Sequence, residues 1–107
     1  MAYDSELDRR VSAVIADWGT TRKKMFGGTC YVLHGNMLCG VLEDSLILRL
    51  GREKAAPALA EPHTNPFDVS GRPMKGWVMV EKAGLTDEAL ADWLLQARSF
   101  TEKLPPK

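Results

Sequence analysis

The sequence predicts one α+β domain with two layers, in which helices pack against an antiparallel sheet and the elements follow the order α-βββ-α-ββ-α. Two observations lead to this fold class. Apolar residues recur at helical spacing near both ends of the chain, and short strand-like segments separated by tight turns lie between them. The 107 residues match the commonest size of one domain, so residues 1–107 are expected to share a single core.

The first predicted element is an amphipathic helix. Its apolar residues lie three or four positions apart and are Leu7, Val11, Val14, Ile15 and Trp18. Asp4 or Ser5 can cap the start of this helix, and Gly19 can end it.

A glycine pair in Met25-Phe26-Gly27-Gly28 precedes the strand-like region. A phosphate-binding loop has a strand before it and a helix after it, which is the reverse of the order predicted here. We therefore interpret Gly27 and Gly28 as a tight junction that leads from the first helix into the sheet.

Three strands are predicted next, at residues 26–33, 37–42 and 46–50. The turn signal Gly35-Asn36 separates the first two strands, and Glu43-Asp44-Ser45 separates the second two. Two tight turns imply a three-stranded antiparallel meander.

The second half of the chain alternates helix and strand signals. Residues 51–60 predict a helix that Pro57 either opens or kinks. Residues 61–74 carry half of the six prolines and predict an extended loop with a short strand at 67–69, and residues 75–81 predict a further strand. The final helix has Thr86 as its candidate N-cap, and Pro105-Pro106 ends any helix. Its apolar stripe consists of Leu90, Trp93, Leu94 and Ala97.

The turn at Gly35-Asn36 sets the predicted register of the meander. A two-residue turn there places Val32 opposite Cys39 and Cys30 opposite Val41, so that these four residues share one face. The other face is also apolar and carries Tyr31, Leu33, Leu38, Leu42 and Ile47. Because an antiparallel sheet in a small monomer usually exposes one face to water, the second face needs a cover. Either the middle helix or another subunit supplies it, and we expect a homodimer.

The same register predicts the positions of the two cysteines and of one isolated arginine. Cys30 and Cys39 become diagonal neighbours about 7 Å apart, which is too far for a disulfide, so both are expected to be free buried thiols. Arg49 stands alone in an apolar strand, opposite Gly40, with its stem directed toward Tyr31. Its expected role is structural stacking or a dimer contact.

Composition limits the classes of function. Lysine plus arginine equals aspartate plus glutamate at 14 each, so no overall field attracts nucleic acid or an anionic membrane. The chain shows neither a signal peptide nor an apolar run of about 20 residues, so a cytoplasmic location without membrane association is expected. His34 and His63 have no sequence-local partner, and no metal-ligand or nucleophile motif is present. We therefore predict no catalytic, metal-binding or cofactor-binding residues.

Arg22-Lys23-Lys24 is the only local cluster of cations, and such a run after a helix is typical of a solvated linker. In an alternative interpretation these residues, with Arg72 and Lys75, contact the phosphates of nucleic acid or another partner.

A series of short motifs resembles the N-terminal domain of the TfoX/Sxy family. In chain order they are Met25-Phe26-Gly27-Gly28, Gly35, Leu48-Arg49, Pro66-Phe67, Gly71-Arg72-Pro73-Met74, Gly76-Trp77-Val78 and Leu104-Pro105-Pro106-Lys107. The resemblance implies a two-layer α+β domain similar to secretion-chaperone-like folds, and it supplies no catalytic residue. Full-length competence regulators of the family carry a second, C-terminal domain and are implicated in activating DNA-uptake genes, whereas we expect a stand-alone N-terminal domain here.

Together these observations predict a non-enzymatic, dimeric interaction module that binds a protein partner in transcription regulation. Two alternatives remain. One is a direct DNA-binding accessory factor that uses the basic residues named above. The other is a small-molecule binder or enzyme with a pocket under the loop at residues 61–74.

Overall fold

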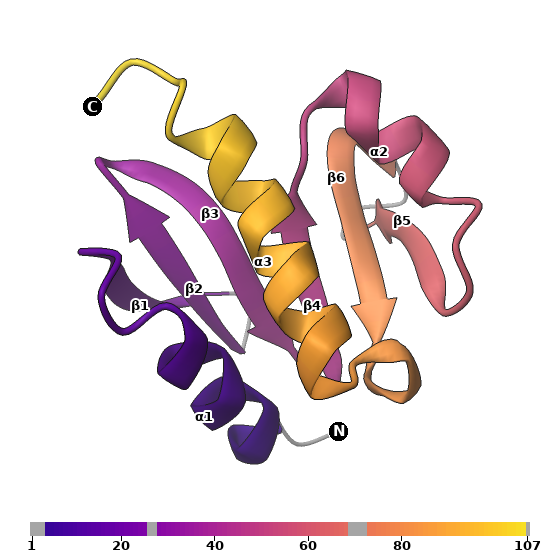
Figure 1. The fold of residues 1–107 in the computed structure, drawn as a ribbon, viewed down its shortest axis with the longest axis horizontal. Helices are drawn as coiled ribbons and strands as arrows, with labels where there is room; N and C mark the ends of the chain where they lie inside the picture. The colour runs from indigo at the N-terminus through magenta and orange to yellow at the C-terminus, as the bar shows by residue number, and fades with distance from the viewer. Residues whose placement is uncertain (1–3, 26–27, 69–72, 107) are drawn as a thin grey trace.

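The computed structural model describes residues 4–25, 28–68 and 73–106, and it confirms the predicted α+β fold with one additional strand. In chain order the elements are α1 (Ser5–Val14), β1 (Thr21–Met25), β2 (Gly28–Leu33), β3 (Asn36–Leu42), β4 (Ser45–Arg49), α2 (Arg52–Ala58), β5 (Thr64–Asp68), β6 (Pro73–Glu81), a short 3-10 helix (Lys82–Gly84) and α3 (Asp87–Thr101). Within the described ranges the six strands form one antiparallel sheet with the order β1-β2-β3-β4-β6-β5 (Figure 1).

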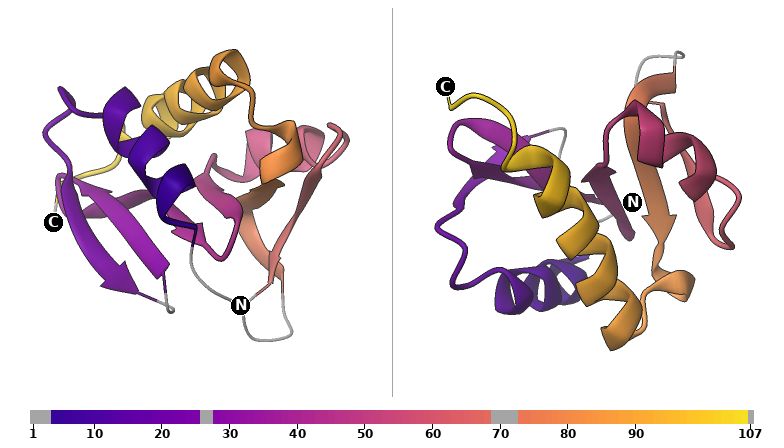
Figure 2. Two further views of the ribbon diagram at one scale, coloured as in Figure 1. Left: turned by 90° about the horizontal axis from the view of Figure 1, so that it is seen from below. Right: turned by 45° about the horizontal axis from the view of Figure 1, so that its top comes forward.

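The helices α1, α2 and α3 lie on the same side of the sheet (Figure 2). Ala55 and Ala58 of α2 belong to the same buried core as Trp93 of α3, which agrees with this arrangement. The middle helix therefore does not cover the opposite face of the sheet. This placement excludes the middle helix as the cover predicted for the second apolar face, and another subunit is the alternative that remains.

Local sequence signals account for α1 and α3. A carboxylate oxygen of Asp4 accepts a hydrogen bond from the Leu7 N–H at 3.0 Å, and the Thr86 hydroxyl accepts one from the Ala89 N–H at 3.2 Å. The stripe predicted for the last helix is buried and consists of Leu90, Trp93, Leu94 and Ala97. The first helix is shorter than predicted and ends at Val14, because the chain turns after this residue to enter β1.

The middle helix is also shorter than predicted. Pro57 does not open α2 but lies in its last turn, and the helix ends at Ala58. A proline lacks the N–H that donates to the carbonyl four residues earlier, so the helix loses one hydrogen bond at Pro57 and ends at the next residue. The next strand, β5, begins at Thr64, before the predicted strand at residues 67–69, and Val69 lies outside the described residues.

The basic run predicted as a linker is instead the edge strand β1. Met25 at its end pairs with Gly28 at the start of β2, so the predicted junction between helix and sheet is wrong. Phe26 and Gly27 lie outside the described residues. Lysines on an edge strand prevent pairing with the strands of other chains. This explains why the strand is as highly charged as a solvated linker.

The predicted register between the next two strands is wrong by one residue. Leu33 pairs with Asn36, so the turn consists of His34 and Gly35, whose φ angles are 53° and 84°. Two successive positive φ angles are the signature of the hairpin turn that matches the twist of the strands. A bulge follows, and Cys39 pairs with Tyr31 rather than with Val32.

This register changes the two predicted faces. Tyr31, Leu33 and Leu38 belong to the helix-covered core together with Cys39 and Val41, while Ile47 lies on the opposite face. On that face Ile47 forms a row with Cys30, Gly40 and Met79, and Leu42 follows in the next row toward Ser45. The prediction of apolar side chains on both faces therefore remains, but with different members. We call the helix-free side of the sheet the outer face.

Candidate functional site

The basic residues predicted to contact a partner do not form one patch. Lys23 and Lys24 are exposed on edge strand β1, whereas Lys75 lies on β6, with β2, β3 and β4 between them. Arg22 is exposed too, but it donates two hydrogen bonds to one carboxylate oxygen of the buried Asp8, at 2.7 and 3.2 Å. Arg72 lies outside the described residues.

Asp8 is the centre of a buried polar network between α1 and the first hairpin. Its second carboxylate oxygen accepts hydrogen bonds from the hydroxyls of Thr29 and Tyr31. Ser12 lies 3.0 Å from the Tyr31 hydroxyl, and burial together with the Asp8 hydrogen bond raises the pKa of Tyr31. Both carboxylate oxygens of Asp8 accept hydrogen bonds from residues of the sheet, so the network holds α1 against the first hairpin. These hydrogen bonds also offset the cost of burying a carboxylate.

Most of the described lysines and arginines that form no ion pair lie near Gly51. Of the twelve lysines and arginines in the described ranges, five form ion pairs with carboxylates. Of the other seven, five line pockets around Gly51, where β4 leads into α2, and these are Arg49, Arg52, Lys54, Lys75 and Lys103. A chain with no net charge thus carries a locally positive surface at this corner.

Arg49 occupies the centre of this corner, and its predicted environment is wrong. Gly40 pairs with Ile47, while Arg49 pairs with Trp77 on β6. The guanidinium carbon of Arg49 lies 5.5 Å from the centroid of the Trp77 ring and 5.9 Å from that of Phe100. The stacking role predicted for Arg49 is present, with rings of β6 and α3 in place of Tyr31.

Backbone contacts fix the two elements that meet here. The Gly76 carbonyl accepts hydrogen bonds from the N–H groups of Leu50 and Gly51, at 2.9 and 3.0 Å. Gly51 has a φ of 85°, and a β-carbon at this position would lie 2.6 Å from the Phe100 ring. Only glycine fits this turn, because any side chain would both strain the backbone and collide with the ring.

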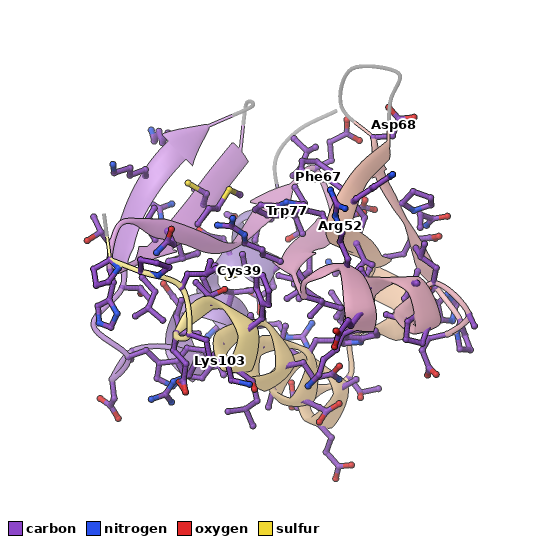
Figure 3. The ribbon with its side chains drawn as sticks, turned by 90° about the horizontal axis from the view of Figure 1, so that it is seen from above. Cys39, Arg52, Phe67, Asp68, Trp77 and Lys103 are labelled. Carbon is purple, nitrogen blue, oxygen red and sulfur yellow. The ribbon has the colours of Figure 1, made fainter. Side chains whose placement is uncertain are left out.

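Two connected pockets lie on the β6 side of this turn. The smaller one has a volume of 160 Å³ and is lined by three cations, Arg49, Arg52 and Lys75, and by the rings of Trp77 and Phe100. The larger one has a volume of 500 Å³ and shares Arg52, Lys75, Gly76 and Trp77 with the first. Its remaining wall is apolar and consists of Ala55, Ala56, Leu59 and Pro66. Figure 3 shows Trp77 on the side of the sheet away from α3, with Arg52 nearby.

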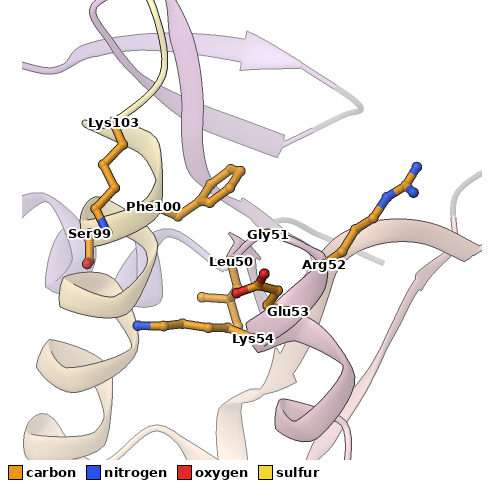
Figure 4. Close-up of a pocket in the computed structure, with 8 residues that line it drawn as sticks. All are labelled: Leu50, Gly51, Arg52, Glu53, Lys54, Ser99, Phe100 and Lys103. Carbon is orange, nitrogen blue, oxygen red and sulfur yellow. The ribbon is translucent and has the colours of Figure 1, made fainter.

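A third pocket of 350 Å³ lies on the α3 side of Gly51 (Figure 4). Lys54 extends from α2 toward α3, and Lys103 extends toward Ser99, while Arg52 points away to the opposite side. Glu53 also lines this pocket, so its charge is mixed. The purely cationic environment is therefore confined to the pocket of Arg49, Arg52 and Lys75.

Groups suited to catalysis or metal binding do not converge in the part of the chain that the structure describes. No cluster of three histidine, cysteine or acidic side chains is found there, and His34 and His63 are exposed in separate turns. Cys30 and Cys39 are both free and buried, and because they lie on opposite faces of the sheet they are not the diagonal neighbours predicted. Burial raises the pKa of both thiols, which makes them poor nucleophiles at neutral pH.

A family model described as the TfoX N-terminal domain matches residues 15–100. The chain belongs to this family. Comparisons with curated proteins and with solved structures gave no match.

The matched part of this TfoX N-terminal domain begins after α1 and runs almost to the end of α3. It includes Arg49, Arg52, Lys75, Trp77 and Phe100, so the pocket that these residues line is within the family domain. The family is in general one of non-catalytic domains. Among the described residues, the helices are too short or too polar to cross a bilayer.

Sequence reasoning identified Arg49 and Lys75 as separate candidates but missed Arg52 and Phe100 of the TfoX N-terminal domain. One local signal was available. Gly51 stands between a strand and an alanine-rich helix, with arginines two positions before it and one position after it. A glycine turn brings such flanking residues to one end of the sheet. Nothing in the sequence indicates the contribution of Phe100, which comes from the far end of the chain.

Proposed function

We propose that this TfoX N-terminal domain is a non-enzymatic interaction module that functions as a homodimer joined through the outer face of the sheet. The observation that carries this proposal is an apolar sheet face without a helix over it. Val32, Met37, Met79 and Leu42 are half-buried there and surround the buried Ile47.

A second copy of the chain is a suitable occupant for physical reasons. Two antiparallel sheets pack face to face about 10 Å apart through interdigitated apolar side chains, which the half-buried Val32, Met37, Leu42 and Met79 can supply. The equal numbers of cationic and anionic residues mean that no net repulsion keeps two copies apart. A twofold axis through this row would bury the same residues of both copies.

Light scattering coupled to gel filtration tests the assembly. At about 10 μM the wild-type protein should have twice the chain mass of 11.8 kDa, and Met79→Glu should give the mass of one chain, because burying an unpaired carboxylate in the interface costs several kcal/mol. Leu95→Glu is the matched control, since Leu95 is 52% exposed on α3. A monomeric wild-type protein, or equal effects of the two substitutions, would refute the homodimer.

We further propose that the homodimer serves regulation by binding a protein partner, as the resemblance to the TfoX/Sxy regulators implies. Direct binding along DNA is less well supported, because the structure separates Lys23 and Lys24 from Lys75 by three strands and leaves no continuous basic track among the described residues. Crosslinked affinity capture with wild type and Met79→Glu tests the regulatory role. Recovery of the same proteins by both, or of none, would contradict a partner that depends on the dimer.

A further inference from the structure

We propose that the two connected pockets between β6 and α2 bind a small phosphate monoester that carries an apolar body. The phosphate group would lie among Arg49, Arg52 and Lys75, and the apolar body would pack against Leu59, Pro66 and Trp77. This site is built within one chain, and its Arg49 and Trp77 form the next pair beyond Ile47 and Met79 on the outer face, so it borders the proposed homodimer interface.

The first argument is the charge of the smaller pocket. Arg49, Arg52 and Lys75 all line it, and no described carboxylate lines either connected pocket. An anion in this pocket would be attracted by all three cations, with no described lining carboxylate to compete for them.

The second argument is the preorganisation of Arg49. Its side chain is half-buried and held against the rings of Trp77 and Phe100, and within the described residues its guanidinium N–H groups donate no hydrogen bond. A guanidinium carries five donors in a rigid fork that matches phosphate oxygens. A fixed arginine with unused donors binds an anion at a smaller entropic cost than a mobile surface arginine does.

The third argument is the apolar extension of the site. The larger pocket has a volume of 500 Å³, within the roughly 300–1,000 Å³ typical of small-molecule sites. Leu59 at its wall is 39% exposed, and it is one of two large hydrophobic side chains exposed in the described residues. Because this wall meets the cations at Arg52, Lys75 and Trp77, one ligand can place an anionic head and an apolar body in the two pockets together.

Charge and size select the class of ligand. A phosphate monoester carries about 1.5 to 2 negative charges at neutral pH, which suits three cations better than the single charge of a carboxylate. The pockets hold a small molecule, whereas nucleic acid needs a continuous basic track that the described part of the sheet does not provide. We therefore infer a small organic phosphate rather than a polynucleotide.

Calorimetric titration tests the site with 1-naphthyl phosphate, inorganic phosphate, 1-naphthol and a short single-stranded oligonucleotide. The naphthyl phosphate is expected to bind at least tenfold more tightly than each of the other three. The double substitution Arg52→Gln with Lys75→Gln should weaken its binding at least tenfold, and both residues are exposed, so the fold should be retained. Lys23→Gln with Lys24→Gln removes the same charge from β1 and should leave the binding unchanged.

Several results would overturn the proposal. Equal affinity for naphthyl phosphate and inorganic phosphate would show that the apolar wall contributes nothing. Equal loss of binding in the two double variants would show a general charge effect, and tighter binding of the oligonucleotide would identify nucleic acid as the occupant. No binding of naphthyl phosphate at millimolar concentration would also refute the site. Light scattering of the wild-type chain reports the oligomeric state without ligand, and calorimetry reports ligand binding, so failure of the dimer and failure of the site are distinguishable.

Discussion

Substitution of Gly28 by alanine tests the packing of the first hairpin on the rest of the sheet. A β-carbon on Gly28 would lie 2.0 Å from the carbonyl oxygen of Val41 and 3.3 Å from the α-carbon of Leu42, both of which are backbone atoms of β3. Ordinary contacts between carbon and oxygen begin at about 3.3 Å, so the two strands would have to separate by roughly 1 Å. No rotamer change can relieve this contact, because no side-chain atom causes it.

We therefore expect Gly28→Ala to lower the free energy of unfolding by about 3 kcal/mol, at the upper end of the usual cost of overpacking. For a chain of this size the melting temperature should fall by roughly 12–24 °C. Gly19→Ala is the matched control, since Gly19 has a φ of 74° but a β-carbon added there would meet no atom within 4 Å. The control should cost only the conformational strain of about 1–2 kcal/mol.

Urea denaturation of both variants, followed by circular dichroism, gives the two free energies from the midpoint and the slope. The expected result is a lower midpoint for Gly28→Ala than for Gly19→Ala with similar slopes. If Gly28→Ala were as stable as wild type, or more stable than Gly19→Ala, then the close approach of β2 and β3 at this position would be wrong.

Two further predictions concern charged groups. Asp8→Ala should lower the free energy of unfolding by about 2–4 kcal/mol, because it removes buried hydrogen bonds to a charged group, whereas Glu6→Ala at an exposed ion pair should cost much less. Similar urea midpoints for these two variants would contradict the structural role of the buried network. The hydrogen bond from Lys82, and then that from the Leu7 N–H, lower the pKa of Asp4. A lowered folded-state pKa gives stability that is present above the unfolded value of about 3.9 and is lost as the pH falls through the folded value. Asp4→Asn should therefore be less stable than wild type at pH 7 and equally stable near pH 2, and a difference that persists at pH 2 would exclude this ion pair as the cause.

The sequence alone predicted an element correctly where residues close together in the chain determine its structure. The cap at Thr86 and the stripe from Leu90 to Ala97 are set by residues within one or two turns of each other, and both predictions are confirmed. Strand β1 was missed because its residues are mostly charged, and its place in the sheet depends on pairing with β2 rather than on its own pattern. Edge strands are defined by a partner, so composition alone identifies them poorly.

The predicted register between β2 and β3 was wrong for a different reason. Gly35-Asn36 and His34-Gly35 are both plausible two-residue turns, and the sequence does not distinguish them. The structure uses His34 and Gly35 and adds a bulge at Tyr31 and Val32, which together move Cys39 to the helix-covered face. Because successive side chains of a strand point to opposite faces, a shift of one residue exchanges the predicted faces.

The candidate site follows from a second difference in register, between β3 and β4. The predicted pairing of Arg49 with Gly40 would have placed the arginine over the middle of the meander. In the structure Ile47 takes that place, and the last pair of these strands is Cys39 with Leu48, so Arg49 lies just beyond the end of the ladder. No β3 residue pairs with it there, and the ring of Phe100 from α3 lies beside it instead. The same shift brings Arg49 to the turn at Gly51, where Arg52 and Lys75 also line the pocket. A displacement of two residues along β4 thus converts an arginine buried in a sheet into the fixed cation of a candidate anion site.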